Sequence, residues 1–147
     1  MKVWIALGLC TMVLSSFVGL TACCGGKVAE CNKLIGVINN NAEAIKTAGD
    51  KLNQASGNDL KALDDAASTL DKAAADIKTV ELKDETLKSF SKEYEGMFTE
   101  GATALRDAAK AAKGNDLGAL NKATAEISKM GSTEAALVSK VNGYCSK

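Results

Sequence analysis

The sequence predicts an all-α protein, an antiparallel up-down-up-down four-helix bundle. Of the 147 residues, 46% are apolar but only 4% are aromatic, and proline is absent. Together with abundant alanine, this composition suits closely packed helices better than sheets. Apolar residues recur at alternating spacings of three and four, the period of an amphipathic helix, in four separate segments. The length allows one domain with a modest core and is too short for two ordinary domains.

Residues 1–22 are expected to be an export signal that lies outside the fold. No charged residue occurs between Lys2 and Lys27, and the apolar run ends in small residues, as export signals do. The run from Val3 to Ala22 is also just long enough to cross a bilayer as an uncleaved anchor. The cysteine that follows this run favours the export signal.

The residues "LTAC", Leu20 to Cys23, resemble the lipobox of bacterial lipoproteins. In that motif an aliphatic residue and two small residues precede the cysteine that receives diacylglycerol and becomes the mature N-terminus. The resemblance implies lipidation of Cys23. Cys24 fits less well, because it would place Cys23 where the motif requires a small residue. An ordinary secretory signal that happens to precede a cysteine is the alternative.

The remaining chain divides into a short tether and the bundle. Residues 23–27 are expected to form a lipidated tether, since Gly25 and Gly26 carry no side chains, and residues 28–147 form the bundle domain. Four apolar stripes predict the four helices of this domain, at residues 28–52, 60–77, 87–108 and 117–145.

Turn residues separate the predicted helices. The stretches "SGNDL" at 56–60 and "KGNDL" at 113–117 each supply a glycine for a left-handed helix end, followed by Asn and Asp that can cap the next helix. The break at "VELKDE" has no glycine, but Asp84 can cap the third helix and Glu85 suits its first turn.

The two GND turns also indicate an internal repeat. "GNDLKALDDA" and "GNDLGALNKA" match at seven of ten positions and lie 57 residues apart. A duplicated helical hairpin explains this match. Alternatively, tight turns between alanine-rich helices converge on similar residues.

The topology predicts a disulfide between Cys31 and Cys145. Short connections make neighbouring helices antiparallel, so the first helix begins at the end of the bundle where the last helix finishes. An exported protein is in a compartment that permits disulfides. Two buried free thiols are the alternative, and Cys24 is left without an assigned role.

The residue types give little support to catalysis. The chain has no histidine, which removes the commonest general base and metal ligand, and no residues suited to a haem or di-metal site. Catalytic, metal and cofactor sites are therefore not expected. Asp64 with Asp65, and Glu93 with Glu95, resemble paired carboxylates. At these spacings helical side chains diverge, so we interpret them as a solvated face that pairs with lysines such as Lys61.

Aromatic residues are few after the export signal, namely Phe90, Tyr94, Phe98 and Tyr144. The first three follow one face of the third helix. We expect a core role for this stripe, although a cluster of this kind also suits a lipid or cofactor pocket.

The functional hypothesis is a non-catalytic periplasmic lipoprotein with a structural or protein-interaction role. Removal of residues 1–22 takes away Lys2 and leaves 17 basic and 18 acidic residues, a net charge of −1, which argues against nucleic acid as a partner. The expected partners are the membrane, through the N-terminal lipid, and an unknown envelope protein. The expected location is the outer membrane, facing the periplasm.

"ECNKLIGVIN" near the start and "VNGYC" at the end resemble uncharacterised bacterial lipoproteins in which cysteines bracket a helical domain. That resemblance implies a layout and no activity. The alternative function is a carrier that holds a lipid or small apolar ligand within the bundle. An enzyme with an unrecognised carboxylate site is a third hypothesis.

Overall fold

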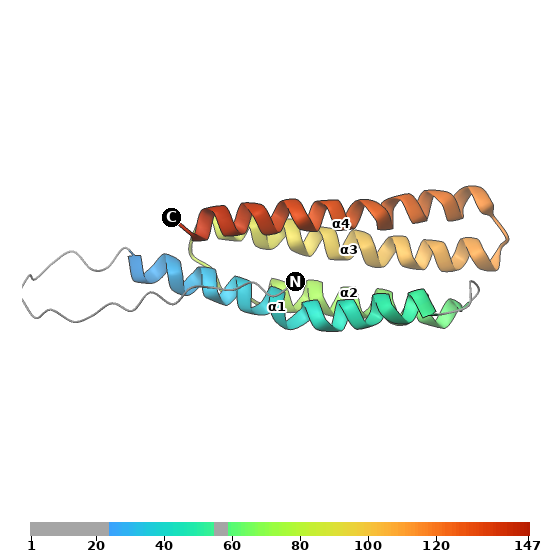
Figure 1. The fold of residues 1–147 in the computed structure, drawn as a ribbon, viewed down its shortest axis with the longest axis horizontal. Helices are drawn as coiled ribbons and strands as arrows, with labels where there is room; N and C mark the ends of the chain where they lie inside the picture. Colours follow the sequence, from blue (N-terminus) through green and yellow to red (C-terminus); the bar gives the residue numbers. More distant parts are fainter. Residues whose placement is uncertain (1–23, 55–58) are drawn as a thin grey trace, which may run out of the picture.

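The computed structural model describes residues 24–54 and 59–147, which form four helices. They are α1 (Cys24–Gln54), α2 (Leu60–Lys78), α3 (Glu85–Lys113) and α4 (Leu117–Cys145). The helices run alternately up and down, with α1 beside α2 and α3 beside α4 (Figure 1). The described ranges contain no strand. The all-α prediction and the four-helix bundle are confirmed.

The first helix starts earlier than predicted. α1 begins at Cys24, so Gly25, Gly26 and Lys27 belong to the helix and do not form a separate link. The predicted export signal and the lipidation residue Cys23 lie outside the described residues. In the part of the chain that is described, no helix combines the length and apolarity needed to cross a membrane.

Aspartates cap the last three helices as predicted. The Asp59 carboxylate accepts from the Ala62 N–H at 3.0 Å, and Asp116 accepts from the Ala119 N–H at 2.9 Å. The two caps are equivalent positions of the proposed repeat. Asp84 accepts at 2.9 and 3.0 Å from the N–H groups of the second and third residues of α3. Each cap satisfies N–H groups that have no partner within the helix.

The end of α3 differs from the prediction in one residue. Gly114 keeps a helical φ of −86°, and Asn115 takes the left-handed conformation with a φ of 53°. The Asp116 N–H donates to the Ala111 carbonyl at 2.9 Å, and the Asn115 N–H donates to the Ala112 carbonyl at 3.2 Å. These bonds form a Schellman motif. Asn tolerates this conformation next best after glycine, so Asn115 takes the left-handed position and Gly114 is the C-cap of α3.

The core forms mainly around α3, which packs against α2 on one side and α4 on the other. The largest fully buried side chains are Tyr94, Leu34, Ile77, Leu87 and Leu137. α1 packs mainly against α2 and makes little contact with α3 or α4. It is therefore the least embedded helix of the four.

The fourth apolar stripe is only partly in the core, since Leu117, Thr124 and Gly131 are exposed. Leu117 is 73% exposed, because it is the first residue of α4 and lies at the tip of the hairpin. The aromatic stripe fits its prediction better, since Tyr94 and Phe98 are buried and Phe90 is half-buried. Burial raises the pKa of Tyr94 to about 12, with a smaller contribution from the charge of Glu134.

Candidate functional site

Cys31 and Cys145 meet at one end of the bundle, as the topology predicted. Their Sγ atoms lie 2.10 Å apart in a disulfide, and their Cα atoms lie 5.9 Å apart. Cys31 is buried in a small apolar cluster with Leu34, Leu82 and Leu87. The bridge joins the first turns of α1 to the last turn of α4, across 114 residues of sequence.

A carboxylate next to Cys31 fastens α1 to the connection between α2 and α3. The Glu30 side chain accepts from the Lys83 N–H at 2.7 Å and from the Asp84 N–H at 2.8 Å. These two backbone hydrogen bonds, that of Asp84 first, lower the pKa of Glu30. Sequence reasoning missed this contact, because no local pattern links residues 53 positions apart.

Asp84 serves two purposes at the same end of the bundle. One oxygen caps α3, and the other accepts from the Tyr144 hydroxyl at 2.7 Å. The Tyr144 hydrogen bond is the main cause that lowers the pKa of Asp84, and the same bond raises the pKa of Tyr144. The Lys27 ammonium lies 4.0 Å from the centre of the Tyr144 ring, which is a cation–π contact.

These contacts form what we call the end network, made of Lys27, Glu30, Asp84 and Tyr144 beside the disulfide. It connects α1, the α2–α3 connection, α3 and α4. Every member is engaged in a hydrogen bond or cation–π contact with another part of the fold. The end network therefore has a structural role, because its contacts hold these parts of the fold together.

The predicted paired carboxylates are used as ion pairs. Asp65 pairs with Lys61, and Glu95 lies 3.5 Å from Lys78. Glu93 pairs with Lys140 at 2.7 Å, which joins α3 to α4. Asp65, Glu93 and Glu95 are thus each paired with a lysine, as the interpretation as a lysine-paired face predicts.

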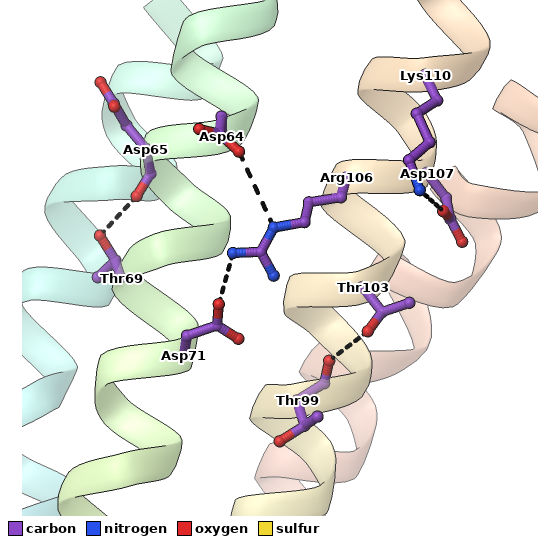
Figure 2. Close-up of polar contacts among 9 residues, drawn as sticks. All are labelled: Asp64, Asp65, Thr69, Asp71, Thr99, Thr103, Arg106, Asp107 and Lys110. Atoms are coloured by element: carbon purple, nitrogen blue, oxygen red, sulfur yellow. Dashed lines mark hydrogen bonds and ion pairs between the residues drawn. The ribbon is translucent and has the colours of Figure 1, made fainter.

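Asp64 contributes to a second cross-helix contact (Figure 2). Arg106, the only arginine of the chain, extends from α3 between Asp64 and Asp71 of α2. Its Nη2 lies 2.5 Å from Asp71 and its Nε lies 3.9 Å from Asp64. The Asp71 hydrogen bond raises the pKa of Arg106. The guanidinium is thereby used to hold two helices together.

Open grooves follow two helix pairs. The larger, about 770 Å³, runs between α1 and α2, and is lined by residues that include Ala44, Thr47 and Ala66. A smaller one of about 290 Å³ lies between α3 and α4 beside Gly101 and Met130. Within residues 24–54 and 59–147, no group of three or more acidic or cysteine side chains is arranged to hold a metal ion.

The chain matches no protein-family model, no curated protein and no solved structure at a significant level.

Proposed function

We propose that the chain is a lipid-anchored protein of the cell envelope with a non-catalytic structural or protein-interaction role. Cys23 would carry the lipid, and the helical bundle would stand at the periplasmic face of the outer membrane. The main support is the pairing of Cys31 with Cys145, because disulfides persist in oxidising compartments outside the cytosol. The lipobox-like residues Leu20 to Cys23 support attachment to a membrane through a lipid on Cys23.

The use of the charged side chains also supports a binding or structural role. Catalytic groups are often found where burial or like charges shift a pKa towards the working pH. Here Glu30 and Asp84 have lowered pKa values because each carboxylate accepts hydrogen bonds that hold the fold together. Such a carboxylate stays ionised and stabilises the fold.

Export and lipidation are tested by measuring the intact mass of the protein extracted from membranes. We expect loss of residues 1–22 and the added mass of acyl chains. Cys23→Ser should abolish the acyl mass, and Cys24→Ser is the matched control that should keep it. A full-length unmodified chain, or acylation lost only in the Cys24 variant, would contradict the proposal.

The compartment is tested by peptide mapping of the same extract without reductant. We expect a peptide that joins Cys31 to Cys145. A link between Cys24 and Cys31 would contradict the proposed closure. Crosslinking in intact cells, followed by identification of the attached proteins, would then name the envelope partner.

A carrier of lipid or another apolar ligand is the second candidate. The observation in its favour is the shallow packing of α1, whose apolar residues Ile35, Ile38, Ile45 and Leu52 are only partly buried against the core. Movement of α1 would open the interior of the bundle. Lipid that co-purifies in stoichiometric amount, beyond the covalent acyl chains, would favour the carrier, and an empty bundle would favour the interaction role.

A further inference from the structure

The α1–α2 groove has the shape of a helix-docking surface. Its lining combines small side chains with charged residues of both signs. Small lining residues allow a second helix to approach closely, as in other tight helix pairs. The alanines that line the groove are Ala44, Ala48, Ala62 and Ala66.

The polar residues that form the α1 edge of this groove are spaced symmetrically about Thr47. Five exposed residues follow one another at spacings of three, four, four and three, so that the pattern has the same spacing from either end. All five line the groove, and they are Asn40, Glu43, Thr47, Lys51 and Gln54. A two-fold axis at Thr47 exchanges the two ends of this edge.

The charges on this edge complement those of an antiparallel copy. With the axis at Thr47, Glu43 of one copy lies opposite Lys51 of the other, and the pair occurs twice. Asn40 lies opposite Gln54, and two side-chain amides can both donate and accept. Contacts of this reciprocal kind define an isologous interface.

Glu43 and Lys51 differ from the neighbouring charges. Lys46 pairs with Asp50 on α1, and Lys61 pairs with Asp65 on α2. Within the described residues neither Glu43 nor Lys51 makes an ion pair. Both residues line the same groove, where the charges of a partner can pair with them.

We propose that the α1–α2 groove is a self-association surface that takes α1 of a second copy, antiparallel to its own α1 and centred on Thr47. Each groove then receives the α1 edge of the other copy. This placement covers the least embedded helix of the monomer on its exposed side. The proposal does not depend on the lipid anchor, because it rests on residues 40–54 and the facing side of α2.

Charge reversal tests the proposal most sharply. The full chain, extracted from membranes in detergent, is examined by sedimentation equilibrium with the detergent density-matched. Wild type should form dimers, and Glu43→Lys or Lys51→Glu should weaken association about tenfold or more, because two attractive pairs become two repulsive ones. The double variant E43K/K51E restores opposite charges across the axis and should restore the dimer.

The control is Lys92→Glu, a charge reversal at an exposed residue of α3 outside the groove, and it should leave the dimer intact. Far-UV circular dichroism checks that each variant is folded. A wild-type chain that stays monomeric up to about 1 mM would overturn the proposal, since even weak association shows at that concentration. So would a double variant that is folded but no better associated than the single ones.

A photo-crosslinking side chain locates the contact. Placed at position 47, it should join two copies through their α1 peptides, and placed at the exposed position 132 of α4 it should not. Crosslinks from position 47 that reach only other proteins would contradict self-association and assign the groove to a different partner.

Discussion

At the scale of single residues, the bundle depends on a few side chains that each satisfy several backbone groups. Glu30 holds two N–H groups of the α2–α3 connection, and Asp84 holds two N–H groups of α3 and the Tyr144 hydroxyl. Because both carboxylates accept these hydrogen bonds more strongly when ionised, folding favours their charged forms. Their folded pKa values are therefore lower than their ordinary values of 4.5 and 3.8.

This linkage predicts loss of stability in acid. A lowered folded pKa means that the unfolded chain binds the proton more readily, so the contribution is fully present above the ordinary value and is lost as the pH falls through the folded value. Urea unfolding at pH 7 and pH 3 should show that Glu30→Gln reduces this pH dependence. Glu81→Gln changes an exposed carboxyl without a hydrogen-bond partner in the described residues and should keep the wild-type dependence. Equal behaviour of the two variants would refute the linkage.

Asn115 gives a second prediction at this scale. Its φ of 53° is costly for residues with a Cβ and costs glycine nothing. Asn115→Gly should hold or raise the free energy of unfolding by up to about 1 kcal/mol, and Asn115→Val should lower it by about 1–2 kcal/mol. Thermal unfolding measures both, and a Val variant as stable as wild type would mean that the turn takes another conformation in solution.

At the scale of elements, the helices differ in how closely they approach. Gly101 of α3 faces Met130 of α4 and Leu70 of α2, and a Cβ at this position would overlap the Met130 sulfur and crowd Leu70. Gly131 of α4 faces open space. Gly101 therefore has a packing role between α3 and its neighbours, whereas Gly131 meets no such neighbour within the described fold.

Paired substitutions distinguish the two glycines. Gly131→Ala should stabilise the chain by about 0.5–1 kcal/mol through helix propensity alone. Gly101→Ala should lose that gain because Met130 must move, and Gly101→Leu should destabilise by about 1–3 kcal/mol through overpacking. Chemical denaturation of the three variants gives the comparison, and a stabilised Leu variant would show that α3 and α4 lie farther apart.

At the scale of the whole molecule, the bundle consists of a well-packed group, α2 to α4, and a more loosely attached α1. Among the described side chains of α1 only Cys31, Leu34 and Asn41 are buried, and the first two lie at the disulfide end. The remaining length of α1 is held mainly by α2. The disulfide and the end network therefore keep α1 close to α4 at this end.

Removal of the disulfide should lower the local stability of α1 more than that of the other helices. The double substitution Cys31→Ser with Cys145→Ser should cost up to about 4–5 kcal/mol by the chain-entropy model, since the bridge closes a long loop. Hydrogen exchange should then show faster exchange in α1 than in α3, because local stability follows packing density. Simultaneous loss of protection in all four helices would contradict this order.

Much of the fold could be predicted because its signals are local. The caps at Asp59, Asp84 and Asp116 each act within three residues, and the helical period shows which side of each helix is apolar. The pairing of Cys31 with Cys145 followed from the up-down order, which brings both cysteines to one end of the bundle, and from the expected export of the chain. The choice of Asn115 over Gly114 for the left-handed position was missed, because both residues suit a helix end.

The sequence by itself determined the four amphipathic helices and the points at which α2, α3 and α4 begin. It also determined that the two cysteines meet at one end of the bundle. Only the tertiary structure decided that Glu30 holds the α2–α3 connection, that Arg106 bridges to Asp71 across 35 residues, and that α1 lies against α2 with little contact to α4. The physical reason is that helical periodicity specifies an apolar face. Which faces meet, and how closely, depends on the shapes of side chains brought together from distant parts of the chain.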